Sequence, residues 1–261
     1  MADSDVKTAS PDAVPAAKRA APAYVDFKGA FRIDYNAPMP AYDHGPVKAY
    51  RAQSTDRDGG EDIALVCERH LMPRTRLVSN YRAIAHPMLV PMSGSGVVFW
   101  PPARQERYVF LYKNVLGNRL LKDEKQAALG WRQDDVMNAV VKPMVLLLQD
   151  FRDKEFVHGS IRPSNMFDGG KAARPDNVIL GDCLSVPCSY TQPILYETVQ
   201  RGMTHPAARG LGTLADDIYA FGVSLAVLLR THDPLKDMTD EEIIHAKMME
   251  GSYGAVTGKD R

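Results

Sequence analysis

The hydrophobic pattern of this chain changes its period near residue 114, and that change constrains the fold more than any other feature. Ahead of it, short runs that read as extended strands alternate with polar turns such as 56–60. Beyond it, apolar residues recur at helical spacing. Strands collected before helices are typical of an α+β protein, so the sequence predicts a small β-rich part followed by a helical part.

Five strands and one helix are predicted in the first part. The helix covers residues 75–84 and ends before Pro87, because a proline disfavours helical backbone at the residue before it. The last two strands read as a hairpin across 101–104. The predicted strands cover residues 31–35, 47–52, 63–67, 96–100 and 107–112.

The second part is predicted to hold three helices and a short strand, the strand at 177–180. Residues 134–151 place apolar side chains along one stripe, and Pro143 within that run is expected to bend the helix. Residues 217–229 are apolar nearly all round, which predicts a fully buried helix. Residues 240–250 are amphipathic and follow a capping box of Thr239 and Glu242.

Composition divides the chain into three stretches. Residues 1–25 are rich in Ala and Pro and carry little periodicity, so we expect a disordered leader there. Residues 26–113 and 114–261 are then the β-rich and the helical parts. A chain of 261 residues is long enough to bury a sizeable core.

Charge and hydropathy exclude several classes of function. Lys and Arg number 32, as do Asp and Glu, so the charge gives no support for nucleic-acid binding. No run approaches the roughly 18 apolar residues of a membrane span, and the N-terminus has no apolar signal segment, so we expect a cytoplasmic protein without a membrane span. Cys67, Cys183 and Cys188 are too few for a disulfide framework or a closed zinc site, and buried thiols are favoured over a pair of Cys183 with Cys188.

Residues 156–167 read Phe-Val-His-Gly-Ser-Ile-Arg-Pro-Ser-Asn-Met-Phe, and this stretch resembles the catalytic loop of protein kinases. In that resemblance, His158 takes the place of the loop's histidine and Asn165 that of its metal-binding asparagine. Gly159 replaces the arginine, and Ser160 replaces the aspartate that accepts the substrate's hydroxyl proton. Arg162 stands where serine/threonine kinases usually carry lysine. The frame and the metal side of the loop are kept, and its base is lost.

Further landmarks follow in kinase order. Residues 181–184, Gly-Asp-Cys-Leu, resemble the D-F-G region, with Asp182 as the magnesium-binding aspartate. Residues 217–222 resemble the start of the central helix, and 112–115 stand where the hinge between lobes belongs. Four stretches are similar to a group of bacterial kinase-like proteins that are labelled serine/threonine kinases, namely 64–67, 158–163, 192–193 and 209–222.

The resemblance runs from about residue 31 to the end and implies a bilobal protein-kinase-like fold of the α+β class. Such a fold has a small five-stranded β lobe with one helix and a larger helical lobe. The helical lobe here lacks its last helices, so we expect a C-terminally incomplete domain that continues into a further region. Glu197 resembles the glutamate that ends a kinase activation segment, and no arginine partner is evident, because Arg261 is the only arginine after Arg230.

Four parts of a phosphoryl-transfer site can be checked, and each is altered. The span 35–45 matches the glycine-rich loop but holds one glycine and two prolines, which remove amide donors. Cys67 stands at the place of the phosphate-binding lysine, and no Asp or Glu that could pair with such a lysine occurs from 69 to 105. Ser160 cannot act as a base near neutral pH. Three acidic residues near it in sequence are candidates to replace it: Glu155, Asp168 and Asp176.

We therefore predict a catalytically impaired kinase homologue, or pseudokinase, that serves as a regulatory or interaction module for a protein partner. No catalytic residue is assigned in the degenerate loop of His158, Ser160 and Arg162. Arg162, Asn165 and Asp182 are the candidates for binding a weak magnesium–ATP ligand, with Asn165 and Asp182 as the metal pair. Two alternatives stay open. One is an atypical ATP-dependent serine/threonine kinase or nucleotidyl transferase that uses this pair around a metal, and the other is a nucleotide sensor without turnover.

The same residues also have purely structural interpretations. His158 can pack beneath the 181–184 segment, Asn165 can cap loop amides, and Asp182 can hydrogen-bond the loop. Asp217 is expected to accept backbone amides from residues 158–160. Cys67 is then a buried thiol.

Overall fold

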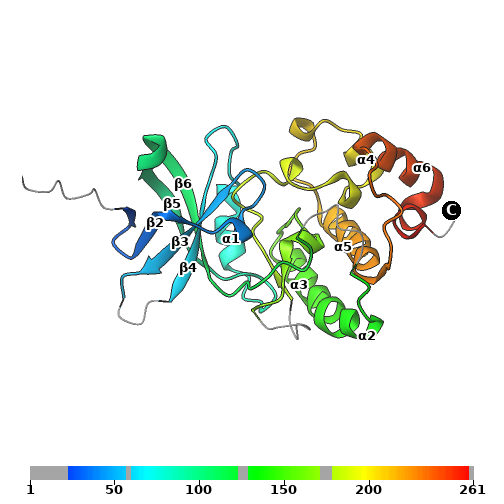
Figure 1. Cartoon of the computed structure of the whole chain (residues 1–261), viewed down its shortest axis with the longest axis horizontal. Helices are drawn as coiled ribbons and strands as arrows, with labels where there is room; N and C mark the ends of the chain where they lie inside the picture. The colour runs from blue at the N-terminus through cyan, green and yellow to red at the C-terminus, as the bar shows by residue number, and fades with distance from the viewer. Residues whose placement is uncertain (1–22, 57–59, 123–128, 171–177, 259–261) are drawn as a thin grey trace, which may run out of the picture.

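A six-stranded antiparallel sheet forms the first part of the molecule, in the spatial order β1-β2-β3-β4-β6-β5 (Figure 1). The computed structural model describes residues 23–56, 60–122, 129–170 and 178–258. The strands are β1 Tyr24–Phe27, β2 Phe31–Pro38, β3 Lys48–Ser54, β4 Glu61–Val66, β5 Met92–Trp100 and β6 Gln105–Lys113. Each neighbouring pair runs antiparallel.

The two edges of this sheet approach each other, so the sheet is nearly closed, like a barrel. Directly after β1, Lys28 Nζ donates a hydrogen bond to the backbone oxygen of Ser95 on β5 at 2.8 Å. The ring of Phe27 lies against Gly94, where an added Cβ would come within 3.1 Å of the ring. Glycine at position 94 therefore lets the Phe27 ring cover the gap between the edge strands.

This architecture corrects the expected fold. The α+β class is as expected, but the predicted bilobal kinase-like arrangement, with a five-stranded lobe of one helix beside a larger helical lobe, is wrong. The sheet has six strands and is nearly closed. The omitted strand is β1, which pairs with β2 through a tight turn in which Lys28 and Gly29 have φ values of 56° and 71°. Such turns are usually signalled by Asn-Gly or Asp-Gly, and Lys-Gly gives no such signal.

Few long helices follow the sheet, which corrects the predicted helical lobe as well. The longer ones are α3 Lys142–Asp153, α5 Leu214–Leu229 and α6 Asp240–Thr257 (Figure 1). The described residues between α3 and α5 form a small sheet of β7 Met166–Phe167 and β8 Ile179–Leu180, the four-residue helix α4 Val199–Gly202, and 3-10 turns. Irregular backbone, and not a set of helices, therefore carries the residues of the candidate site.

The remaining helical elements are short. α1 Val78–Arg82 follows a 3-10 turn at Thr75–Leu77, so the predicted helix at 75–84 exists but is only partly α-helical. The other 3-10 turns are Pro40–Tyr42, Pro101–Ala103, Pro163–Asn165, Cys188–Tyr190, Ile194–Tyr196 and Pro206–Ala208.

A π-helical turn at Met137–Val141 joins α2 Gln133–Val136 to α3 and shows how the predicted proline disturbance is accommodated. Pro143 has no N–H to donate to the carbonyl oxygen of Ala139. The turn before it widens, and that carbonyl oxygen accepts from the backbone N–H of Val178 at 3.5 Å. The helix therefore continues through the proline, and its unused acceptor holds the segment that leads into β8.

The two C-terminal helices begin at capping boxes. Thr239 and Glu242 exchange the expected hydrogen bonds at the start of α6, and Thr213 and Asp216 do the same for α5. The prediction that the helix at 217–229 is fully buried is wrong, because Ile218 is 52% exposed. One side of α5 therefore faces solvent.

One hydrophobic core connects the sheet to the helices, and a second cluster fills the inside of the nearly closed sheet. Ile63 and Leu65 on β4 belong to the first core, together with α3 residues such as Leu147. Ala64 and Val66, which alternate with them, belong to the second cluster. Both faces of β4 are thus buried, which explains its uninterrupted apolar sequence.

Some sequence predictions fall on residues that the structure does not describe. The predicted leader, 1–25, lies outside the described residues up to residue 22, and residues 24 and 25 belong to β1. The predicted strand at 177–180 appears as β8, with residue 177 outside the described part. Among the described helices, none is long and apolar enough to cross a membrane.

Candidate functional site

The loop of residues 156–165 is anchored by a carboxylate from the first turns of α5. Asp217 is completely buried and accepts hydrogen bonds from the backbone N–H groups of His158 at 2.7 Å and Gly159 at 2.6 Å. These bonds confirm the structural interpretation of Asp217. Burial raises the pKa of Asp217 to about 7, against the two amide hydrogen bonds that lower it. Gly159 has a φ of 70°, and a Cβ there would lie 2.8 Å from Cys188 Sγ, so glycine is required at the anchored position.

His158 is a packed, neutral side chain. Its ring stacks on Phe151 with centroids 5.9 Å apart, and it is completely buried. Nδ1 accepts a hydrogen bond from the N–H of Ser160 at 3.2 Å, which leaves the proton on Nε2, 3.2 Å from the carbonyl oxygen of Gly181. Burial, aided by the charge of Arg74, lowers the pKa of His158 to about 3. The ring therefore orders the loop and exchanges no proton near neutral pH.

Ser160 and Arg162 bind to each other. Arg162 Nη1 donates to Ser160 Oγ at 2.6 Å and to Gln192 Oε1 at 2.9 Å, while its Nε donates to Ser164 Oγ at 2.9 Å. All four side chains are buried. The hydroxyl at the position of the kinase base is thus an acceptor for an arginine of its own loop.

Asn165 and Asp182, the predicted metal pair, are brought together but are used by the protein. Asn165 Nδ2 donates to the backbone oxygens of Ser160 at 2.9 Å and Asp182 at 3.0 Å. Asp182 Oδ1 accepts from Tyr112 Oη at 2.6 Å, and its Oδ2 accepts from the N–H and the hydroxyl of Ser185. Burial raises the pKa of Asp182, but the charge that His44 gains when it is protonated in acid and the hydrogen bonds from Ser185 and Tyr112 outweigh it, so the pKa lies below its usual range.

The chain already uses polar atoms of both residues, and their role as a metal pair stays a prediction. Magnesium would need open lone pairs on the Asp182 carboxylate and on the amide oxygen of Asn165. Both carboxylate oxygens already accept hydrogen bonds from the chain, and Asn165 directs its NH₂ group at loop carbonyls. Nowhere in the described part of the chain do three or more His, Cys, Asp or Glu side chains gather to hold a metal ion.

A cavity of about 10 Å³ lies beside Asp182 and is far too small for a nucleotide. A single water molecule needs about 10–15 Å³ of such space, so the cavity admits one water at the limit. Its polar walls come from Tyr42, His44, Tyr112, Arg119, Asn165 and Asp182.

The segment 35–45, which matches the glycine-rich loop, folds inward over this cavity. Arg119 holds it there: its Nε donates to Ala41 O at 2.9 Å, its Nη2 to Asp43 O at 2.5 Å, and its Nη1 to Ser164 O. The segment also places His44 at the cavity wall, where burial lowers the pKa of this residue to about 4. This segment, 35–45, is called the cover below. It gives the cavity wall a neutral imidazole and contains two prolines, so it does not present a row of amide donors.

An aromatic cluster occupies the region expected for the lysine–glutamate pair. Cys67 follows β4 as a buried thiol whose pKa is raised by burial. From α1, the ring of Tyr81 meets Tyr112 at 6.1 Å and Phe156 at 5.8 Å between centroids. Contact between α1 and the loop is thus made by neutral rings, which need no charge partner.

Arg74 is a central residue that the sequence did not reveal. It is buried between β4 and α1, and its Nη1 donates to the carbonyl oxygens of His158 at 2.7 Å and Cys183 at 2.8 Å. The same atom lies 3.0 Å from Cys188 Sγ, and Nη2 donates to Val157 O at 2.5 Å. Because these partners are mainly backbone oxygens far along the chain, no local pattern marks this arginine. One guanidinium therefore fixes both the loop and the segment after Asp182.

Glu197 has a partner that the sequence prediction did not assign. Arg201, four residues on in α4, donates to Glu197 through Nε at 2.7 Å, and Arg209 Nη1 lies 4.0 Å from the same carboxylate. Helical i,i+4 spacing would have been a usable signal. Glu197 therefore needs no ion-pair partner from an arginine near the C-terminal end of the sequence.

The candidate replacement bases are engaged elsewhere or lie outside the described residues. Glu155 is exposed at the turn after α3. Asp168 accepts hydrogen bonds from the N–H groups of Asn118 and Gly170, each at 2.8 Å. Asp176 lies outside the described part of the chain. The structure thus assigns none of them to Ser160.

The chain matches no protein-family model, and no curated protein matches it in sequence. The resemblance to kinases therefore stays a prediction that depends on the motifs quoted above. Fold and site together define an α+β protein with a nearly closed sheet and a largely buried loop that is held by hydrogen bonds from Asp217 and Asn165.

Proposed function

We propose that the protein is a catalytically impaired kinase homologue that serves as a regulatory or protein-interaction module in the cytoplasm. Two observations support this function: the order of the kinase-like motifs, and a site in which Ser160, Asn165 and Asp182 are hydrogen-bonded by the protein's own chain. The six-stranded sheet lends no support to a kinase fold, so the proposal depends on the motifs and the site.

The small volume of the cavity beside Asp182 is the observation that best supports this proposal. Catalysis of phosphoryl transfer depends on charges placed around bound phosphates. Here the cavity measures about 10 Å³, and Tyr112, Arg119, Asn165 and Asp182 beside it are hydrogen-bonded within the protein. A nucleotide would have to displace the cover at 35–45 and break the hydrogen bonds of Arg119. Those losses would oppose binding before any phosphate contact formed.

Both alternatives, the atypical transferase and the nucleotide sensor, need a nucleotide in this space. The thermal unfolding of the protein with millimolar ATP, with magnesium or with a chelator, tests them together. Ligand at about 100 times its Kd would add about 2.7 kcal/mol to the free energy of unfolding. We expect no concentration-dependent shift in Tm.

Label transfer separates the outcomes further. The protein is incubated with γ-labelled and with α-labelled ATP, and Asp182→Asn serves as the matched control. Transfer of the γ label that is lost in the variant would make the protein a kinase, and transfer of the α label a nucleotidyl transferase. A Tm shift without transfer would make it a nucleotide sensor. Absence of all three is the result we expect.

A further inference from the structure

One buried nitrogen atom of the cover has no hydrogen-bond partner in the described part of the chain. It is Nε2 of His44, a side chain that is only 3% exposed. Burial lowers the pKa of His44 to about 4, so the ring is neutral at pH 7 and carries one N–H donor and one acceptor nitrogen. Buried polar atoms are nearly always satisfied, either by the protein or by ordered water. The unpartnered Nε2 atom therefore indicates a partner that is not part of the chain.

The polar groups nearest to His44 can serve a ligand between them. Asn165 and the charge of Asp182 both raise the pKa of His44, so both lie close to its ring. The NH₂ group of Asn165 is used on the backbone oxygens of Ser160 and Asp182, which leaves its Oδ1 as an acceptor. Tyr112 Oη donates its proton to Asp182 and keeps lone pairs that can accept. A molecule that both donates and accepts could therefore join these groups to Nε2.

The cavity beside Asp182 has the size and the lining that a single water molecule needs. His44, Tyr112 and Asn165 all line it, and its volume is about 10 Å³. A buried water requires about 10–15 Å³ of such space and two to four polar partners. The three residues supply that number of partners. The volume, at the lower limit for one water, leaves no room for a larger ligand.

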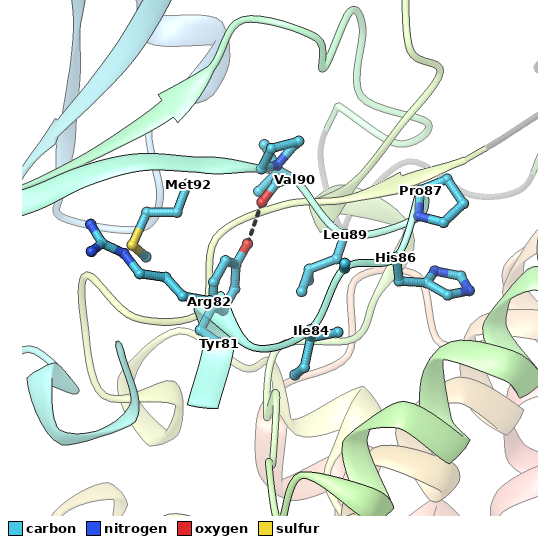
Figure 2. A pocket seen from close by; sticks show the side chains of 10 residues that line it. Tyr81, Arg82, Ile84, His86, Pro87, Leu89, Val90 and Met92 are labelled. Atoms are coloured by element: carbon cyan, nitrogen blue, oxygen red, sulfur yellow. Dashed lines mark hydrogen bonds between the residues drawn. The ribbon is translucent and has the colours of Figure 1, made fainter. Parts of the chain in front are cut away.

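The walls of this cavity are fixed by hydrogen bonds. Arg119 holds the cover through Ala41 and Asp43. On another side, Val90 N donates to Leu180 O at 3.1 Å, and Val90 O accepts from Tyr81 Oη at 2.6 Å (Figure 2). A molecule in the cavity can therefore leave only when one of these walls opens, and it should exchange slowly with bulk water.

We propose that the cavity is a binding site for a single water molecule, which bridges the cover to the loop through His44 Nε2 and Asn165 Oδ1, with Tyr112 Oη as a third partner. Because water both donates and accepts, it satisfies Nε2 in either tautomer of the ring. The bridge is a second link between the cover and the loop, beside the hydrogen bonds of Arg119. It does not depend on the proposed interaction function, since the ligand is solvent.

A high-resolution crystal structure of the whole chain tests the site directly. We expect one density peak in the cavity, about 2.7–3.2 Å from Nε2 of His44 and from Oδ1 of Asn165. Data collected at the absorption edges of zinc and manganese separate a water oxygen, which gives no anomalous signal, from a metal ion. This measurement needs no variant.

Oxygen-17 magnetic relaxation dispersion, which counts slowly exchanging water molecules, tests the site in solution. His44→Leu removes the polar nitrogen, and an apolar cavity stays dry. We expect this variant to hold one slowly exchanging water fewer than the wild type. His44→Gln is the matched control, because its amide group restores a polar partner at this position, and it should keep the wild-type count. Circular dichroism verifies the fold of each variant.

Three results would overturn the proposal. The first is an empty cavity in the crystal, with Nε2 of His44 bonded directly to Asn165 Oδ1. The second is a peak with the anomalous signal of a metal ion, and the third is the same count of slowly exchanging waters in all three proteins. None of these results bears on the proposed function, which the nucleotide experiments test separately.

Discussion

The loop at 156–165 and a groove of about 380 Å³ between the end of α1 and the start of β5 (Figure 2) meet at Val90, yet their polar side chains are in opposite states. In the loop, charged and polar side chains are buried and bound to one another, as Arg162 is to Ser160. In the groove, Arg82 and Ala85 are exposed, and Arg82 forms no hydrogen bond or ion pair within the described part of the chain, while the apolar floor at Leu89 and Val90 is buried. The motif-bearing stretch is thus the closed part of the molecule, and a stretch without any motif is the open one.

This difference shows that the identity of a residue does not tell whether its polar atoms are free to bind a ligand. Asn165 and Asp182 keep the identities of metal ligands, but the NH₂ group of Asn165 and the carboxylate oxygens of Asp182 form hydrogen bonds within the chain. Arg82 belongs to no motif, and its charge is accessible. A functional assignment from sequence therefore needs a count of what each polar atom already binds.

Thiol accessibility should show the largest contrast between the two regions. Cys67, Cys183 and Cys188 are buried, and burial raises the pKa of each. We expect a thiol reagent to label them at least about a thousandfold more slowly in the folded than in the unfolded protein, as a free energy of unfolding of several kcal/mol requires. Ala85→Cys, in the groove, is the comparison and should react at once. Rapid labelling of the three native thiols would contradict a closed site.

Removal of the Arg74 guanidinium should destabilise the fold severely. Arg74→Met leaves the carbonyl oxygens of Val157, His158 and Cys183 without this donor. We expect the free energy of unfolding in urea to fall by about 3–5 kcal/mol. Arg82→Met, on the exposed side of the same segment, should change it by no more than about 0.5 kcal/mol. Similar losses in the two variants would mean that the loop does not depend on Arg74.

Acid should act on the closed region through His158. Its pKa is about 3 in the folded protein and about 6.5 unfolded. Between these values the unfolded chain binds a proton that the folded chain does not, so stability rises with pH and is fully present above about pH 6.5. The stability advantage of wild type over His158→Gln should therefore grow by about 1.4 kcal/mol per pH unit from about pH 4 to 6.5.

Urea titrations of both proteins at each pH measure this difference. Asp217 has the opposite sign, because its raised pKa favours the fold below about pH 3.8, and this contribution is lost as pH rises through about 7. It is present in both proteins and cancels in the comparison. Parallel pH profiles would show that His158 is not held neutral by the fold.

A smaller loss is expected when the loop's anchor changes by one atom. Asp217→Asn turns one acceptor into an NH₂ group that faces the N–H of His158 or Gly159. One unsatisfied buried amide costs about 1–3 kcal/mol, which chemical denaturation can resolve. Asp153→Asn, at an exposed ion pair on α3, serves as the control and should be nearly neutral. An unchanged free energy of unfolding in Asp217→Asn would refute the anchoring role.

Sequence periodicity located most of the helices and strands, because the order of apolar and polar residues within each element indicates its type and its buried face. The alternation at 31–35 and 107–112 and the apolar stripe at 134–151 correspond to β2, β6 and α2–α3. β1 escaped because its four residues follow an Ala- and Pro-rich stretch and turn at Lys-Gly. The near closure of the sheet could not be predicted either, because it depends on a contact between Phe27 and Gly94, which lie far apart in sequence.

The sequence identified the motif residues, but it did not predict their hydrogen-bond partners. His158, Asn165, Asp182 and Asp217 do gather as the motif spacing predicts. Arg74 and Tyr112, which bind His158 and Asp182, and Arg119, which binds Ser164 of the same loop, lie far away in sequence, and the two arginines bind backbone oxygens, which any residue supplies. Such partners leave no periodicity or spacing behind. The groove was missed for the same reason, because exposure is a property of the folded chain.

The hydrogen bonds of Arg119 join segments that are 78, 76 and 45 residues from it along the chain. One side chain thus closes the cover at Ala41 and Asp43 and also grips Ser164 in the loop. Neither segment can open while the other stays in place without leaving donors of this guanidinium unused. The cover and the loop therefore behave as a single foldon, whose amide hydrogens should exchange with one common opening free energy. The segment at 35–45 is therefore expected to open only together with the loop at 156–165.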